Sequence, residues 1–228
     1  MKGKLLLILL FILLVLFWVF KKEFLLSSKM VLTWNSQTKT FLLSKDKNLS
    51  KPPKNNDFKD YILKNGEFKI TQSGNILWES SDDWYVTGFS FSDVTNDGLP
   101  EVSLSVWKKG NFGVDKPFWV KENDQSERNH FFVFQFEDKT MKPIWQSSNL
   151  EAPNCEFVVV DLDNDNKNEL VTVEGEYTSG RICQGKYLAV WKWNGWGFSN
   201  EWRSEKGNFG NLTVKEIDGR RLVGVTVH

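Results

Sequence analysis

The sequence predicts an all-β fold, a small β-propeller-like array of tandem four-stranded repeats, preceded by one N-terminal transmembrane helix. Three observations support this class. After residue 23, no long segment of the 228-residue chain has a helical period of 3.6. Short runs rich in Val, Phe, Trp and Tyr alternate with turns of Gly, Asn and Asp. The pattern W-x-S also recurs at the ends of three of the expected strands.

The N-terminal helix is predicted from an unbroken apolar run at residues 5–20. These 16 residues span about 24 Å as a helix, and flanking lysines (Lys2, Lys4, Lys21, Lys22) extend that reach toward the lipid headgroups. The N-terminal excess of positive charge places the N-terminus in the cytoplasm and the rest of the chain outside the cell membrane. The alternative is a cleaved signal peptide and a secreted protein.

The charge of the chain divides in the same way. Its 29 basic and 29 acidic residues sum to zero, but four of the lysines flank the apolar run, which leaves 25 against 29 in residues 23–228. A mildly acidic domain argues against nucleic acid as a partner. We divide the chain into a membrane anchor (1–22), a partly ordered start with a polar linker (23–57) and a β-repeat domain (58–228).

The individual strands are expected where apolar runs lie between turn residues. A type I′ hairpin is predicted at Asn65-Gly66, because this dipeptide favours positive φ between two apolar runs. The other expected strands lie at 88–94, 101–108, 130–137, 156–162, 169–177, 187–193 and 221–227.

The W-x-S pattern defines the repeat. Trp78, Trp145 and Trp202 are 67 and 57 residues apart, and each is followed by a strand, an acidic turn and a further strand. The chain ends after the second strand of a unit, and residues 30–44 resemble a third and fourth strand. The two termini would therefore complete one unit, as in a propeller closed by its own ends. A plain antiparallel sandwich and an open or oligomeric array are the alternatives.

One turn has the composition of a calcium loop. Carboxylates stand at its positions 1, 3, 5 and 9: Asp161, Asp163, Asp165 and Glu169. Alternate side chains of a tight loop converge, and the carbonyl of Lys167 at position 7 can complete an oxygen cage for a hard cation. The sequence therefore predicts Ca²⁺ here in a structural role.

A second turn has the same frame with fewer charges. Asp93, Asp97 and Glu101 take positions 1, 5 and 9, with the Leu99 carbonyl at position 7. Thr95 replaces the carboxylate at position 3, so this site is expected to bind Ca²⁺ more weakly. For both turns, the alternative is a hairpin whose side chains bond their own backbone.

The D-x-D-x-D-x-x-x-E pattern between two apolar strands resembles the calcium loop of FG-GAP and VCBS-type repeats, which occur in integrin-like β-propellers and bacterial surface proteins. The resemblance covers mainly residues 86–205. It implies a propeller with structural Ca²⁺ and no particular activity. The FG-GAP tetrapeptide itself is absent, and the third turn, at 216–220, is degenerate and is expected to bind nothing. The stretch 107–148 also resembles uncharacterised, membrane-anchored bacterial repeat proteins.

The sequence contains few candidates for catalysis. Nucleophile-elbow, P-loop, H-E-x-x-H and C-x-x-C motifs are all missing, and His130 is expected in the core or at its rim. Cys155 and Cys183 form a disulfide in an oxidising compartment, or are two separate thiols. Trp196, in a turn between two glycines, is the candidate for stacking on a ligand.

These observations predict a membrane-anchored, extracytoplasmic binding or scaffolding module with an envelope protein or a glycan as partner. An enzyme is the less favoured interpretation. Two alternatives remain, a glycan-active hydrolase that uses surface carboxylates and Trp stacking, and a subunit of an envelope complex.

Overall fold

The computed structural model describes residues 28–43, 59–111, 118–122 and 124–228. Within these ranges the chain forms strands and turns and no helix, which confirms the all-β prediction. In chain order the strands are β1 (Ser28–Asn35), β2 (Thr40–Leu43), β3 (Lys59–Lys64), β4 (Glu67–Gln72), β5 (Asn75–Glu79), β6 (Tyr85–Ser92), β7 (Glu101–Lys109), β8 (Glu127–Glu137), β9 (Thr140–Gln146), β10 (Asn154–Val160), β11 (Glu169–Tyr177), β12 (Cys183–Trp193), β13 (Phe198–Arg203), β14 (Phe209–Ile217) and β15 (Arg220–Val227).

The predicted membrane anchor, residues 1–22, lies outside the described residues. Among those that are described, no helix is long and apolar enough to cross a membrane.

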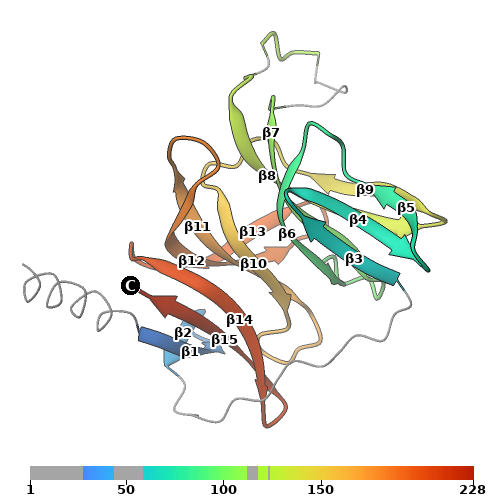
Figure 1. Cartoon of the computed structure of the whole chain (residues 1–228). Helices are drawn as coiled ribbons and strands as arrows, with labels where there is room; N and C mark the ends of the chain where they lie inside the picture. Colours follow the sequence, from blue (N-terminus) through green and yellow to red (C-terminus); the bar gives the residue numbers. More distant parts are fainter. Residues whose placement is uncertain (1–27, 44–58, 112–117, 123) are drawn as a thin grey trace, which may run out of the picture.

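The strands form three antiparallel sheets (Figure 1). Strands β6–β9 form a four-stranded sheet in chain order, and β3–β5 form a three-stranded one. The eight-stranded sheet has two halves, β10–β13 and β14-β15-β1-β2. The halves are joined by one residue pair between β12 and β14, Gly185 opposite Phe209. Within the described residues, strand pairing does not close these sheets into a barrel.

The two ends of the described chain pair with each other. Strand β1 runs antiparallel to β15, with Ser28 opposite Val227 and Leu32 opposite Val223. The predicted union of the terminal half-units is therefore confirmed. Strands β1 and β2 lie in the segment predicted as a partly ordered start (23–57), and β1 pairs with the last strand of the segment predicted as the β-repeat domain (58–228).

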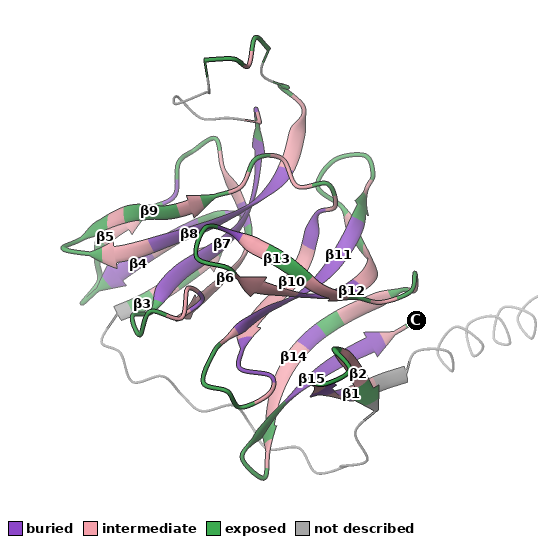
Figure 2. Cartoon of the chain, turned by 180° about the vertical axis from the view of Figure 1, so that it is seen from behind, coloured by how far each residue is buried: buried purple, intermediate pink, exposed green. Residues whose placement is uncertain are grey.

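The middle strands of the sheets are the most buried (Figure 2). In β7, eight of nine residues are buried, and in β11 seven of nine. Both faces of these strands are covered, because their successive residues point to opposite sides and are buried on each. Covered faces explain why β7 and β11 read as continuous buried runs rather than as an alternating pattern.

The core consists of three apolar clusters, and each includes one tryptophan of a W-x-S pattern. Trp78 packs against the cluster around Phe68, Trp145 against that around Phe131, and Trp202 against that around Val190. All three tryptophans are partly buried, so each contributes less than the roughly 1.5–3 kcal/mol of a fully buried large apolar side chain. The three tryptophans thus hold the outer strands β5, β9 and β13 to the core.

The three W-x-S serines make the same two hydrogen bonds. In each case the serine N–H donates to a carbonyl of the neighbouring strand, and the serine Oγ accepts from the N–H of that same residue. The pairs are Ser80 with Phe68, Ser147 with Phe131 and Ser204 with Leu188, at 2.8–3.1 Å. In each pair the serine hydroxyl accepts the hydrogen bond that a backbone carbonyl would otherwise accept. The strand that carries the W-x-S pattern can therefore leave the sheet without leaving the N–H of its neighbour unpaired.

Two further predictions concern local geometry. The hairpin between β3 and β4 turns at Asn65 and Gly66, with φ of 54° and 84°, which confirms the predicted turn. Cys155 and Cys183 form a disulfide between β10 and β12. It lies over Gly175 of β11, where an added Cβ would stand 2.6 Å from the Cys155 sulfur. The cysteines are 28 residues apart, and closing such a loop stabilises the fold by roughly 3 kcal/mol.

Candidate functional site

The two acidic loops occupy equivalent places. Residues 93–101 join β6 to β7, and residues 161–169 join β10 to β11; each closing glutamate is the first residue of the next strand. Positions 4 and 6 have positive φ in both loops, at Asn96 and Gly98 and at Asn164 and Asn166. Asn and Gly tolerate this conformation best, so the two sequences produce one backbone frame.

The loops also lie side by side. The Asn96 side-chain amide donates to the Asn168 carbonyl at 3.2 Å and accepts from the Asn168 N–H at 2.6 Å. The Asn168 side-chain amide donates to the Asp93 carbonyl at 2.7 Å. The first unit therefore fixes one side of the second loop.

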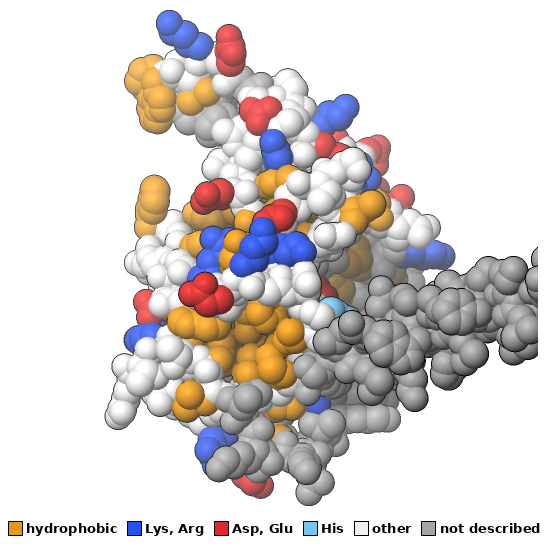
Figure 3. All heavy atoms as spheres, turned by 90° about the vertical axis from the view of Figure 1, so that its left-hand side faces the viewer, with side chains coloured by type: hydrophobic (Ala, Val, Ile, Leu, Met, Phe, Trp, Pro, Cys, Tyr) orange, Lys and Arg blue, Asp and Glu red, His pale blue; other side chains and the backbone are white. Residues whose placement is uncertain are grey.

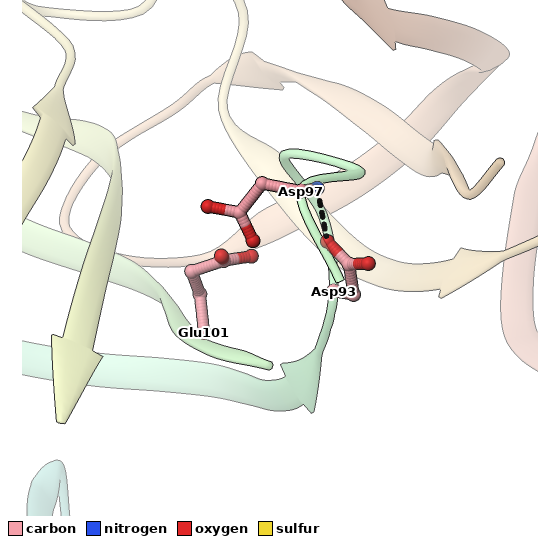
Figure 4. Close-up of side chains that lie close together, drawn as sticks. All are labelled: Asp93, Asp97 and Glu101. Atoms are coloured by element: carbon pink, nitrogen blue, oxygen red, sulfur yellow. Dashed lines mark hydrogen bonds between the residues drawn. The ribbon is translucent and has the colours of Figure 1, made fainter. Parts of the chain in front are cut away.

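In loop 93–101, the aspartates bond the loop's own backbone (Figure 4). Asp93 accepts from the N–H groups of Asp97 at 3.1 Å and Gly98 at 2.9 Å, and Asp97 accepts from the Leu99 N–H at 2.9 Å. These bonds join the aspartates to the loop's own backbone, as in the alternative interpretation of the loop as a hairpin turn. One oxygen from each of Asp93, Asp97 and Glu101 also lies within 4.8 Å of the others, so these carboxylates converge as well.

Glu101 is also satisfied internally. It is 1% exposed, and its Oε2 accepts from the N–H groups of Val94 at 2.8 Å and Thr95 at 3.2 Å. Its Oε1 accepts from the Thr95 hydroxyl at 3.0 Å. Burial raises the pKa of Glu101, and these three hydrogen bonds oppose the rise. Thr95 is therefore a donor to Glu101 rather than a free ligand.

In loop 161–169, Asp161, Asp163 and Glu169 converge, with one oxygen from each lying within 4.8 Å of the others. Some of their oxygens bond the backbone, since Glu169 accepts from the Leu162 N–H and Asp161 from the Asn166 N–H, both at 3.1 Å. Asp165 is not part of this group and accepts from the Lys167 N–H at 2.8 Å.

Three oxygens of this loop accept no hydrogen bond although they are buried: Asp161 Oδ1, Asp163 Oδ1 and Glu169 Oε1. Asp161 is 6% exposed and Glu169 2%. Burying an anionic oxygen without a hydrogen bond is costly, and neighbouring carboxylates repel one another; of these three oxygens, Glu169 Oε1 has a cation beside it, Lys192 at 3.3 Å. Loop 93–101 contains no such oxygen among its described side chains.

Two cations from later strands approach the loop. Lys192 Nζ lies 3.3 Å from Glu169 Oε1 and 3.9 Å from Asp165, and Arg221 lies 3.9 Å from Asp161. Burial raises the pKa of Glu169, and the Leu162 N–H and Lys192 only partly oppose it. Burial lowers the pKa of Lys192, but Glu169 and the nearby aspartates outweigh it and leave that pKa raised.

Lys192 was not among the site residues predicted from the sequence. It stands opposite Glu169 in the pairing of β11 with β12, a register that spacing alone does not reveal. The predicted carbonyl ligands, Leu99 and Lys167, lie at position 7 of their loops, and both side chains are exposed.

A cavity of about 810 Å³ lies between β9 and the β12–β13 hairpin. It is lined by Phe131, Trp145, Trp191, Trp193, Trp196 and Phe198, together with polar residues. Trp196 is 86% exposed in the turn, which agrees with its predicted exposure. The backbone N–H of Trp196 donates to the side-chain oxygen of Asn194 at 3.0 Å. This bond fixes the backbone that carries the indole.

Glu174 and Arg203 form an ion pair on the cavity wall. Glu174 is 3% exposed; its Oε2 lies 2.8 Å from Arg203, and its Oε1 accepts from the Trp191 indole N–H at 2.8 Å. Arg203 also stacks on the Tyr187 ring, 4.1 Å from its centre. Sequence spacing did not reveal this pair, which depends on the alignment of β11, β12 and β13.

His130 is a core residue, as the sequence predicts. It is fully buried, and its Nδ1 lies 3.1 Å from the Ser147 carbonyl oxygen. Burial lowers the pKa of His130 to about 4, so the ring is neutral at physiological pH.

Comparison with protein-family models, curated proteins and solved structures finds no match to this chain. The resemblance to FG-GAP and VCBS-type repeats therefore rests on the loop motif alone.

Proposed function

We propose that this protein is a membrane-anchored, extracytoplasmic binding or scaffolding module. Its propeller-like β-repeats carry one structural Ca²⁺ in loop 161–169. The buried oxygens of that loop carry the proposal: Asp161 Oδ1, Asp163 Oδ1 and Glu169 Oε1 accept no hydrogen bond, and among the described residues Lys192, 3.3 Å from Glu169 Oε1, is the one cation beside these three atoms.

The propeller-like architecture has two supports. The groups β6–β9, β10–β13 and β14-β15-β1-β2 each have four strands, and β3–β5 corresponds to the last three strands of such a group. The repeated serine hydrogen bonds place Ser80, Ser147 and Ser204 in equivalent positions. Repetition of one local geometry is the property expected of tandem blades.

The extracytoplasmic location is supported by the apolar run at residues 5–20 and by the Cys155–Cys183 disulfide. Disulfides persist in oxidising compartments. The face in Figure 3 carries a small basic group among acidic side chains and beside an apolar patch. An envelope protein or a glycan is favoured as partner over nucleic acid because residues 23–228 carry 25 basic against 29 acidic side chains.

For Ca²⁺, the three oxygens supply part of a coordination shell of six to eight ligands. Asp165 and the Lys167 carbonyl, at positions 5 and 7 of the same loop, are candidates for the rest, together with water. Such a shell has no open position for a substrate, so the ion would stabilise the loop rather than take part in a reaction.

Calorimetry with the full-length protein in detergent tests this proposal. Asp163→Asn should lower Ca²⁺ affinity by about tenfold or more, because it removes one anionic ligand. Asp97→Asn in the other loop is the matched control and should leave the affinity unchanged. If the wild-type protein gives no heat of binding with Ca²⁺ and its melting temperature does not change on addition of EDTA, the calcium site is contradicted.

Glycan hydrolysis is a second candidate function, because the tryptophan-lined cavity holds two carboxylates, Glu151 and Glu174. Binding is favoured over hydrolysis because Arg203 and Trp191 already engage Glu174. Incubation with a neutral oligosaccharide and analysis of the products distinguishes the two. Shorter products that disappear with Glu151→Gln would establish the enzyme.

A further inference from the structure

The cavity between β9 and the β12–β13 hairpin combines a rigid aromatic wall with one free indole. Trp145, Trp193 and Phe198 contact one another edge to face, with ring centres 5.2–6.5 Å apart. Gly197 lies against them, because a Cβ there would stand 3.2 Å from the Trp145 indole nitrogen. This packing holds the hairpin in place and leaves Trp196 exposed at its tip. The wall is therefore formed before any ligand arrives.

The polar groups of the cavity restrict the charge of a ligand. Its ionic side chains are Glu151, Glu174 and Arg203, and Arg203 is paired with Glu174. The remaining carboxylate, Glu151, disfavours an anionic ligand. Gln146 and Ser148 line the same cavity with an amide and a hydroxyl. The site thus offers hydrogen bonds and aromatic faces with little net charge.

We propose that this cavity binds a neutral oligosaccharide of equatorially linked hexopyranose units, with Trp196 as the stacking platform. Such a sugar has an apolar C–H face that packs on an indole and a rim of hydroxyls that bond amides, hydroxyls and fixed ionic groups. The volume of about 810 Å³ lies in the range of sites that enclose small molecules. This inference rests on the proposed binding function and names its ligand class.

The test is calorimetric titration of the full-length protein in detergent with the β-1,4-linked tetramer of N-acetylglucosamine. The wild type should bind, and Trp196→Ala should weaken binding by about tenfold. Trp119→Ala is the matched control, because Trp119 is also exposed, at 69%, but does not line the cavity. Trp196→Phe keeps an aromatic face and should retain part of the affinity.

Three results would overturn the inference: no binding by the wild type, equal affinity in Trp196→Ala, or equal affinity for a tetragalacturonate of the same length. Binding of an extended peptide in the cavity without any sugar binding would also overturn it. The calcium site is judged separately with Asp163→Asn. If that variant and the wild type bind the sugar alike while neither takes up Ca²⁺, the cavity proposal stands and the calcium proposal fails. If the wild type takes up Ca²⁺ but does not bind the sugar, the calcium proposal stands and the cavity proposal fails.

Discussion

Loops 93–101 and 161–169 share a backbone frame and differ in how they use their carboxylates. Both have positive φ at positions 4 and 6, and both end in a buried glutamate. In the first loop, backbone N–H groups and the Thr95 hydroxyl satisfy the carboxylates. In the second, three buried oxygens accept no hydrogen bond.

Position 3 accounts for much of this difference. Thr95 donates to Glu101, whereas Asp163 adds an acceptor beside Glu169. One residue thus changes a donor into an acceptor inside the same turn. Spacing thus determines the path of a loop, while the balance of donors and acceptors determines how many of its carboxylate oxygens the protein itself satisfies.

The largest expected effect comes from Glu101→Leu. It orphans the Val94 and Thr95 N–H groups and should destabilise the fold by about 3 kcal/mol with or without Ca²⁺. Glu169→Leu, the matched change, orphans one backbone N–H, that of Leu162, and leaves Lys192 with Asp165 as its ion-pair partner. It should therefore cost less in EDTA, while abolishing stabilisation by Ca²⁺. Chemical denaturation measures both. Equal losses for the two variants in EDTA would remove the distinction between the loops.

Thr95→Asp should convert the first loop into a second cation site. The change replaces the donor to Glu101 with a third carboxylate, so the ion-free protein should lose about 1–2 kcal/mol of stability. Equilibrium dialysis should then find one more Ca²⁺ per chain than in the wild type. Unchanged uptake in a folded variant would show that position 3 does not decide between the loops.

Lys192→Met should raise the affinity of loop 161–169 for Ca²⁺ by about threefold, because it removes an ammonium that competes for Glu169. Lys167→Met is the control, since Lys167 lies in the same loop with an exposed side chain. Calorimetry of both variants measures the change. A fall in affinity with Lys192→Met would mean that the lysine supports the site rather than competing for it.

The smallest effect concerns pH. Because burial raises the folded-state pKa of Glu169, the ion-free fold gains stability from protonation at low pH and loses that gain as pH rises through the folded pKa. Ca²⁺ needs the ionised carboxylate, so the stability difference between Ca²⁺ and EDTA should widen over the same rise. Glu101 and His130 titrate alike with Ca²⁺ and with EDTA, so their contributions cancel in the stability difference between the two conditions. Denaturation from pH 4.5 to 7 measures this difference, which should vanish in Asp163→Asn.

Local patterns predicted much of the fold. Apolar runs separated by turn residues indicated the strands and the Asn65-Gly66 hairpin. The W-x-S repeat indicated that the two ends of the chain pair with each other. These features depend on residues close in sequence or on a repeated motif. Composition alone did not reveal the register of β1 with β15, because this pairing joins segments at opposite ends of the described chain across a polar linker.

The candidate site was predictable only in part. Spacing identified the three converging residues of loop 161–169. It did not identify Lys192, Arg221 or the Glu174–Arg203 pair, because these contacts depend on strand register between distant segments. The hydrogen-bond partners that satisfy loop 93–101 were equally hidden, since the role of the Thr95 hydroxyl depends on where Glu101 points.

The number of Ca²⁺ ions bound per chain tests the central claim most directly. Native mass spectrometry or equilibrium dialysis of the full-length wild-type protein at saturating Ca²⁺ measures this number. The account predicts one ion per chain, lost in Asp163→Asn and retained in Asp97→Asn. Two ions, no ion, or one ion that is lost in Asp97→Asn instead would contradict it.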